Sequence, residues 1–266
     1  MGLLQLPIPI NYNGKIYKEI TFKKMNGGVL ADTNEAREKG NTYTALKTFI
    51  SGCIESIGDI VDLPTIKNIT GYIAYDNVNY IVTKILSIDD DDASIEGIYS
   101  CPLCGNKIIC QHDKISEKDT SDKIKNLKVA FLKSDKLFFT YKLKEVITIE
   151  EKEVNGTVEE IQSMFTTLNQ CEKASNEYGE ENKSQLQYAI LSKGIMKIDG
   201  VDVTEDFKEQ CGINLFRKMD FKDLNNFSEK TIEYGLQNEV DKKCNKCGKV
   251  FKVVLNTSNF FVSALR

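Results

Sequence analysis

Two short cysteine motifs contain the residues of this chain that are best suited to chemistry. Their sequences are Cys101-Pro-Leu-Cys104-Gly and Cys244-Asn-Lys-Cys247-Gly, and about half the chain separates them. Two thiolates spaced by two residues can point at one ion from a tight turn, and four such sulfurs satisfy tetrahedral zinc. The glycine after each pair tolerates the positive φ that a chain reversal needs. The sequence therefore predicts one zinc ion bound by Cys101, Cys104, Cys244 and Cys247.

A local metal site is the alternative to this long-range one. Cys110 and His112 could complete the ligand set of Cys101 and Cys104 without the second motif. Their spacing is short for a zinc finger, in which the second ligand pair follows after about a dozen residues. We therefore favour the long-range site and expect Cys110 to face inward on a strand and His112 to lie on the surface.

Catalytic groups are scarce in this sequence. His112 is the only histidine, which excludes H-E-x-x-H zinc chemistry and leaves one candidate base for a catalytic triad. The motifs G-x-S-x-G, G-x-x-x-x-G-K and G-x-G-x-x-G are absent. A closed four-cysteine site also leaves no coordination position for water. The sequence thus predicts a protein that is not an enzyme.

The charge balance gives little support to nucleic-acid binding. The formal net charge is -4 and the pI is near 5.4. Only Arg37, Arg217 and Arg266 are arginines, so bidentate recognition of phosphates or guanines is poorly supplied. A zinc-ribbon accessory protein that binds nucleic acid is therefore the alternative function rather than the favoured one.

The sequence predicts a protein without a membrane segment. The first ten residues lack a basic region and contain two prolines, unlike a signal peptide, and no apolar run approaches the roughly 20 residues that span a bilayer. We expect the protein to be cytoplasmic when synthesised, and in a reducing compartment its cysteines are metal ligands or buried thiols. Cys53, Cys171 and Cys211 fall in helical stretches and are predicted core residues.

The first half of the chain is predicted to place the first motif between two strands. Alternating residues on both sides of Asn13-Gly14 predict an opening hairpin with its first strand at a sheet edge. A helix with a Thr42 cap carries apolar residues as far as Ile57, and another helix is predicted near 74–88. Strands at 95–99 and 107–111 flank the motif.

The second half repeats this plan after a polar segment. Residues 113–126 are predicted to be a linker, followed by a hairpin of strands 128–132 and 137–149. Thr157 and Glu160 form a capping-box pattern for a helix that reaches Leu168. Further helices are expected near 183–193, 204–219 and 222–234, and strands at 250–255 and 260–262 close the chain.

The predicted fold is α+β, with two β-hairpin-plus-helices halves joined by a zinc-ribbon-like four-cysteine staple. Its divisions are residues 1–112, the linker 113–126 and residues 127–266. The final segment, 259–266, is apolar for a terminus. It is either the closing strand of the metal-bound sheet, which we favour, or a tail that docks on a partner by strand addition. Phe260 and Phe261 contact another surface in both cases and are the candidate partner-binding residues.

Several short motifs follow one another along the chain: Leu6-Pro-Ile-Pro, Ile20-Thr-Phe-Lys-Lys-Met, Tyr75-Asp-Asn-Val-Asn-Tyr-Ile-Val, Cys101-Pro-Leu-Cys104, Ile198-Asp-Gly-Val-Asp, Cys244-Asn-Lys-Cys247-Gly and Asn259-Phe-Phe. This order resembles the T4-type baseplate hub assembly proteins and tail-assembly chaperones of contractile phages and phage-like injection systems. The polar insertion after the first cysteine motif departs from that pattern, so only the four cysteines carry over.

The resemblance implies a non-enzymatic role in building a baseplate or hub. The implied partners are other baseplate, hub or tail proteins, such as the tube and the tape measure, with the protein oligomeric within an assembly. It also implies synthesis in the cytoplasm of a bacterial host. The family members differ in whether they remain in the tail or baseplate of the particle, so both a transient chaperone and a permanent component fit the resemblance.

Overall fold

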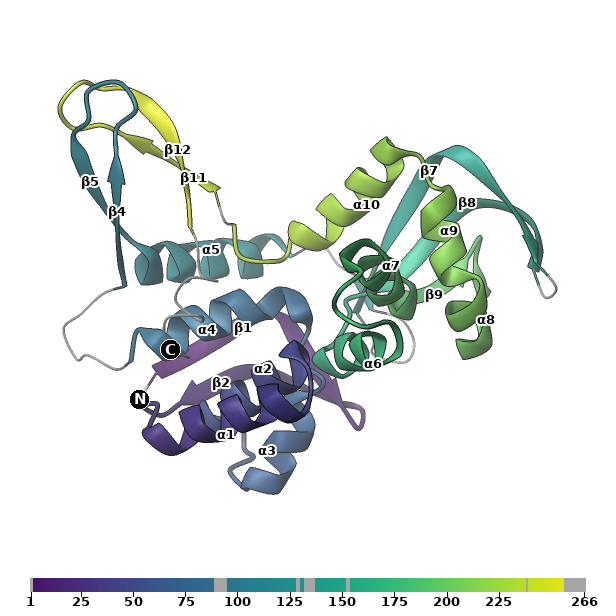
Figure 1. Ribbon diagram of the computed structural model, residues 1–266, viewed down its shortest axis with the longest axis horizontal. Helices are drawn as coiled ribbons and strands as arrows, with labels where there is room; N and C mark the ends of the chain where they lie inside the picture. Colours follow the sequence, from purple (N-terminus) through teal and green to yellow (C-terminus); the bar gives the residue numbers. More distant parts are fainter. Residues whose placement is uncertain are drawn as a thin grey trace.

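The computed structural model describes residues 2–88, 95–127, 130–131, 137–151, 154–237 and 239–255 (Figure 1). Within these ranges the helices are combined with four sheets, of three, five, two and two strands. The expected mixture of helices and sheets is therefore confirmed. None of the described helices is both long enough and apolar enough to cross a membrane.

The first sheet is antiparallel and has the strand order β1-β2-β3. β1 (Gly2–Tyr12) and β2 (Lys15–Phe22) are joined by Asn13-Gly14, whose φ angles of 52° and 77° suit a two-residue hairpin turn. β3 (Ile54–Ile57) pairs with the other side of β2, so β1 lies at the edge. Both the predicted hairpin and its edge strand are confirmed.

Several helical segments pack around this sheet and close the first core. They are α1 (Gly27–Lys39), α2 (Thr42–Cys53), α3 (Leu63–Thr70), the 3-10 turn η1 (Tyr75–Asn77) and α4 (Val78–Leu86). Phe22, Phe49 and Tyr80 are fully buried at its centre.

Helix α2 differs at both ends from the prediction. Asn41 caps it in place of Thr42, because the Asn41 side-chain oxygen accepts hydrogen bonds of 2.9 Å from two N–H groups of the first turn. The helix ends at Cys53, and Ile54–Ile57 continues as β3. Both end residues of β3 are buried against β2, and this strand pairing prevails over the helical spacing of the isoleucines.

The second sheet has the order β10-β9-β8-β7-β6. Its strands are β6 (Ala130–Phe131), β7 (Leu137–Glu151), β8 (Val154–Met164), β9 (Ile195–Ile198) and β10 (Val201–Asp202). The predicted pairing of strands near 128–132 and 137–149 is confirmed by β6 and β7. The helices of this half are α6 (Leu168–Tyr178), α7 (Lys183–Gly194), α8 (Glu205–Gln210), α9 (Gly212–Lys218) and α10 (Phe221–Ile232). The helix expected at 204–219 is thus divided into α8 and α9 at Cys211.

The helix predicted from Thr157 to Leu168 is wrong. Residues 157–164 belong to β8, which pairs with β7 along its length, for example Ile147 with Val158 and Tyr141 with Ile161. The capping box lies ten residues further on, where Thr167 and Gln170 begin α6.

The polar segment 113–126 is not an irregular linker but lies within helix α5 (His112–Asn126). Its buried residues are small or polar, including Ser116 and Thr120, so the apolar periodicity of a typical helix is missing. Asp119 accepts a hydrogen bond from the Tyr80 hydroxyl, which holds α5 against α4. The division of the chain at this segment into domains stays a prediction.

The two halves also contact each other directly, away from the cysteines. The N–H of Leu168 donates to Ile73 O at 3.0 Å, and the N–H of Tyr75 donates to Thr166 O at 2.8 Å. Lys47 on α2 forms an ion pair of 2.5 Å with Glu172 on α6, and both side chains are largely buried. Backbone and side-chain contacts therefore join the halves independently of any metal.

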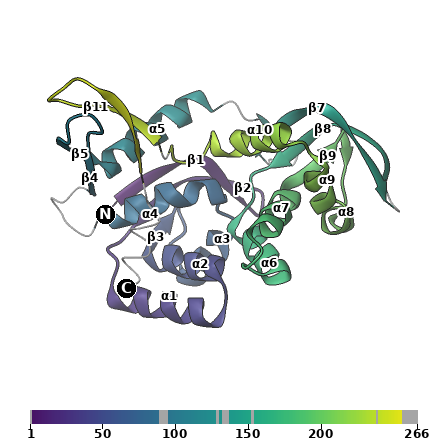
Figure 2. The same ribbon diagram turned by 45° about the horizontal axis from the view of Figure 1, so that its top comes forward.

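Two short hairpins form a separate unit, which we call the head (residues 96–111 and 239–255). They are β4 (Glu96–Ser100) with β5 (Lys107–Gln111), and β11 (Glu239–Lys243) with β12 (Val250–Val254). The head lies beside α5, at the opposite end of the molecule from the five-stranded sheet, in both views (Figures 1 and 2). The strands predicted around each cysteine motif are confirmed. The predicted strand 260–262 lies outside the described residues.

Candidate metal centre

Each cysteine motif forms the same tight turn at the tip of its hairpin. The N–H of Cys101 donates to Asn106 O at 2.9 Å, and the N–H of Gly105 donates back to Cys101 O at 2.9 Å. The second motif repeats these two hydrogen bonds at 2.8 and 2.9 Å. The glycines that end the turns have φ angles of 67° and 74°, as their predicted role requires.

The two hairpins are structural equivalents of each other. Five residues on each strand are paired in each hairpin, from Glu96 with Gln111 in one and from Glu239 with Val254 in the other. Their inner faces pack together around a small core. Because the two hairpins have equal length and register, their turns lie next to each other and the four sulfurs form one cluster.

The four cysteine sulfurs form a cluster with the dimensions of a tetrahedral metal site. The Sγ atoms of Cys101 and Cys247 are 3.6 Å apart, those of Cys104 and Cys244 are 3.7 Å apart, and all four lie within 4.8 Å of one another. A tetrahedral ion with metal–sulfur bonds of about 2.3 Å needs sulfur–sulfur separations of about 3.8 Å. The predicted long-range grouping is confirmed, and the donor set fits a soft or borderline divalent metal.

Backbone groups of the turns favour ionised sulfur at two of the cysteines. The N–H of Cys247, and after it the N–H of Lys246, point at the sulfur of Cys244 and lower its pKa to about 6. At Cys101 burial opposes ionisation, but the N–H groups of its own turn prevail and lower the pKa. The turns thus prepare thiolates, which are the form that binds metal.

The pKa of Cys247 shows why the four cysteines need a bound cation before all of them can be thiolates. The N–H of Lys249 favours its thiolate, but loss of water around the sulfur and the three neighbouring thiols raise its pKa to about 12. Thiolates this close repel one another, so another sulfur ionises only when a positive ion lies between them. A bound divalent metal would remove this repulsion and bind all four cysteines as thiolates.

Asn106 links the two motifs across the cluster. Its amide nitrogen lies 3.9 Å from Cys244 Sγ and donates to Asn245 Oδ1 at 2.7 Å. This side chain therefore orients a ligand of the other hairpin, as partners of metal ligands do. No ligand-spacing rule identifies Asn106, so the sequence did not predict its role.

Cys110 and His112 do not belong to the cluster. Cys110 faces inward and is buried against the second hairpin, as predicted. The prediction that His112 lies on the surface is wrong: only 3% of it is exposed, and its Nε2 lies 2.9 Å from the Tyr99 hydroxyl. Gly97 leaves room for the ring, since a Cβ there would lie 2.5 Å from that nitrogen. Burial lowers the pKa of His112, so the neutral imidazole is favoured.

The remaining site predictions have different outcomes. Cys53 and Cys211 are buried in the two larger cores, and Cys171 is a buried residue of α6, so all three are buried as predicted. Phe260 and Phe261 lie outside the described residues, so their proposed contact with a partner stays a prediction.

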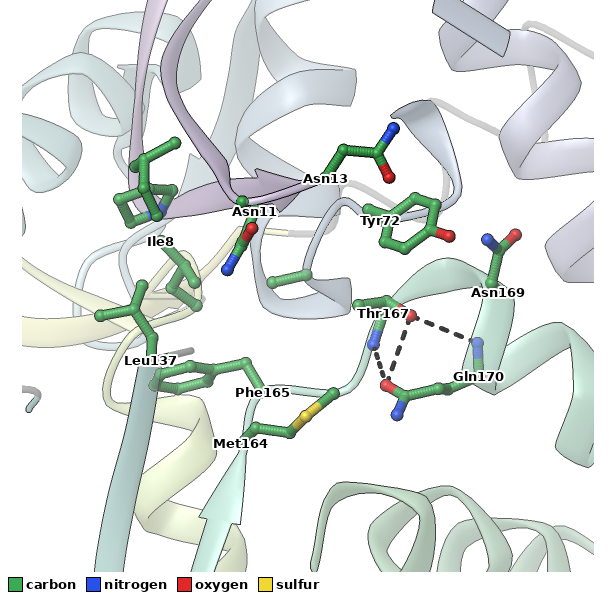
Figure 3. A pocket seen from close by; sticks show the side chains of 14 residues that line it. Ile8, Asn11, Asn13, Tyr72, Leu137, Met164, Phe165, Thr167, Asn169 and Gln170 are labelled. Carbon is green, nitrogen blue, oxygen red and sulfur yellow. Dashed lines mark hydrogen bonds between the residues drawn. The ribbon is translucent and has the colours of Figure 1, made fainter. Parts of the chain in front are cut away.

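A cavity of about 480 Å³ lies between the β1–β2 hairpin and the start of α6 (Figure 3). None of the described residues that line it is an acid, a histidine, a cysteine or a lysine. Its polar side chains are amides and hydroxyls, of which Thr167 and Gln170 already bond to each other. In the view of Figure 3 the Tyr72 hydroxyl points toward Asn169 rather than toward a charged group. The described lining residues therefore include no carboxylate, imidazole, thiol or amine for proton transfer.

The fold and the cluster together define a mixed helix and sheet protein with a four-cysteine centre of metal-binding type. Comparison with known proteins finds no matching family model, no matching curated protein and no matching solved structure.

Proposed function

We propose that the four cysteines bind one structural zinc ion and that the protein is a non-enzymatic scaffold whose head binds other protein subunits. The observation that carries this proposal is the meeting of four Sγ atoms within 4.8 Å from two hairpins far apart in the sequence. Four thiolates close the coordination sphere, which is typical of structural rather than catalytic zinc. The arrangement resembles a zinc ribbon in having one ion between two hairpins.

The small size of the head supports a need for the metal. Its fully buried apolar side chains are those of Cys110, Val253 and Leu255, apart from the cysteine ligands. Two-stranded hairpins are at best marginally stable in water. Structural zinc supplies on the order of 10 kcal/mol of binding free energy, enough to fold a unit of this kind.

The outer surface of the head carries apolar side chains that suit binding to a protein. Ile98 and Ile109 are directly paired across β4 and β5, and they are 66% and 58% exposed. Leu103 lies at the tip of the first turn and is 68% exposed. Exposed apolar groups gathered on a rigid element are a common feature of interaction surfaces.

The proposed setting is the assembly of a contractile phage tail or a phage-like particle. Its partners would be baseplate, hub or tail subunits, such as the tube or the tape measure, and the protein would act in assembly or remain in the particle. This part of the proposal is supported by the likeness of the ordered motifs to the T4-type hub assembly family.

A binding experiment can test the scaffold role. The tagged full chain would be co-expressed with hub, tube and tape-measure subunits of a contractile phage tail, as wild type and as the double variant I98K/I109K. We expect capture of a hub, tube or tape-measure subunit by wild type and at least a tenfold loss in the variant, with zinc retained. Val61→Lys, which changes a 72% exposed residue outside the head, serves as the control. Equal capture by all three proteins would rule out the head as the binding surface.

Lysines on the head give the second candidate function, nucleic-acid binding, some support. The head carries Lys107, Lys242, Lys243, Lys246, Lys249 and Lys252 against the acids Glu96, Glu239 and Asp241. If these lysines contact phosphates, binding to DNA or RNA falls steeply as salt increases. We expect no measurable binding at low salt, and a steep salt dependence would favour this alternative.

A further inference from the structure

A second cavity, of about 340 Å³, lies where the two halves of the chain meet. It is enclosed by residues of α2, η1, the end of β8, α7 and α10, and most of its lining is apolar. Met164, Leu186 and Phe227 contribute to this apolar wall. The position between halves and the mainly apolar surface are typical of small-molecule sites.

Asp76 places a carboxylate in the wall of this cavity. The same residue also lines a neighbouring cavity of about 160 Å³. Among the described residues, no lysine or arginine forms an ion pair with Asp76. Lys123 is the cation that acts on it electrostatically, but the Lys123 ammonium donates to Gly235 O and lies 3.7 Å from the carboxylate of Asp119.

An ionised carboxylate without a cationic partner in these surroundings destabilises the ligand-free protein. Burial raises the pKa of Asp76 to about 7, although the backbone N–H of Asp76 and then Lys123 act in the opposite direction. A carboxylate that lacks a cationic partner in an apolar site is stabilised when a ligand brings one. The cavity is therefore electrostatically complementary to a cation.

Two tyrosine rings strengthen this complementarity. Tyr43 and Tyr75 both line the cavity, and their ring centroids are 5.7 Å apart in an edge-to-face arrangement. Aromatic faces attract ammonium groups, most strongly where water is excluded. Lys183 is the one cation among the described residues of the lining; it is exposed at the start of α7 and does not pair with Asp76.

We propose that this cavity binds a small organic cation, an ammonium group attached to an apolar body, with Asp76 as the anionic partner of the ammonium. The apolar body lies against Leu186 and Phe227, and Tyr43 and Tyr75 flank the charged end. This site is separate from the four-cysteine cluster and does not depend on the scaffold role.

The test compares two probes of equal length on the zinc-loaded full chain, hexylammonium chloride and hexan-1-ol, at pH 8. Titration followed by amide chemical shifts should show that hexylammonium binds at least about tenfold more tightly than the alcohol, with shifts centred on residues of the cavity. Asp76→Asn should remove this preference and leave alcohol binding unchanged. Asp202→Asn, at a side chain 82% exposed, is the matched control and should keep the preference.

A variant that leaves Asp76 intact provides a second measurement in case Asp76→Asn is unstable. Ile190→Trp enlarges a lining residue and should weaken both probes by filling the space. Equal affinity for amine and alcohol in wild type, binding of neither probe, or a preference that survives Asp76→Asn would each overturn the proposal.

Discussion

The four cysteines differ at the residue scale although they belong to one cluster. Backbone N–H groups lower the pKa of Cys244 to about 6, while loss of water and then the surrounding thiols raise that of Cys247 to about 12. Four sulfurs within 4.8 Å therefore favour a shared cation over four free thiols. The two C-x-x-C spacings were sufficient to predict this ligand set. Asn106 was not predicted, because its role depends on the position of the other hairpin.

Cys244→Ser should remove the metal and destabilise the head. The variant leaves three thiolates, so we expect less than a tenth of the wild-type zinc per chain by mass spectrometry and loss of protection from proteolysis in residues 239–255. Cys110→Ala is the control because Cys110 lies outside the cluster. It should keep one zinc per chain, and a loss of zinc there would support the local site instead.

Asp223 is a second residue whose substitution should strongly lower the free energy of unfolding. Only 1% of it is exposed, and its carboxylate accepts a hydrogen bond from the Tyr141 hydroxyl at 2.7 Å and from the N–H of Lys144 at 3.0 Å. These groups lie where the pairing of β7 with β8 is interrupted, between Lys142 and Ile147. Asp223→Ala should lower the free energy of unfolding by about 2–4 kcal/mol, measured by denaturant titration, because it leaves buried donors unpaired.

The matched control for Asp223 is its hydrogen-bond partner. Tyr141→Phe removes one donor and leaves the carboxylate bonded to the backbone, so a smaller loss of about 1 kcal/mol is expected. If the two variants were equally stable, Asp223 would not hold the interrupted part of β7 in place.

At the scale of the elements, segments with a local signal were predicted well. The turn Asn13-Gly14 and the strands around each cysteine motif follow from turn chemistry and alternation. The errors fell on 54–57 and 157–164, where apolar spacing fits a helix but pairing with a distant strand prevails. Segment 113–126 was missed for the opposite reason, because α5 buries small polar side chains and carries charges on its other faces.

Two threonine variants can distinguish the observed capping box, which begins at Thr167, from the predicted one, which would begin at Thr157. Thr167→Ala removes the cap of α6 and should lower the free energy of unfolding by about 1 kcal/mol. Thr157→Ala changes an exposed strand residue and should cost clearly less. Thermal or denaturant unfolding of the two variants measures both losses. A larger loss of unfolding free energy for Thr157→Ala would contradict the assignment of β8.

At the scale of the whole molecule, two kinds of contact join distant segments. Backbone hydrogen bonds and the Lys47–Glu172 ion pair join the two halves, whereas the cysteine cluster and a small core join the two hairpins of the head. The sequence predicted the second kind, since ligand spacing is readable along the chain. It did not predict the first, because partners such as Ile73 and Leu168 carry no sequence signal of their contact.

Removal of the metal should therefore destabilise only the head. After chelation, amide hydrogen exchange is expected to rise at least tenfold in β4, β5, β11 and β12, because these hairpins lose the cluster that joins them. The amides of β2 and β8 should keep their protection, since none of the described residues in their cores belongs to the four-cysteine cluster. Uniform deprotection of the chain would instead mean that the cluster stabilises the whole fold.

The central claim is that one zinc ion is bound by Cys101, Cys104, Cys244 and Cys247. X-ray absorption at the zinc edge of the purified full chain tests it most directly, together with the zinc content per chain. The expected result is one zinc with four sulfur neighbours at about 2.3 Å and no nitrogen neighbour. A chain without zinc, or a mixed shell of sulfur and nitrogen as His112 would provide, would contradict it.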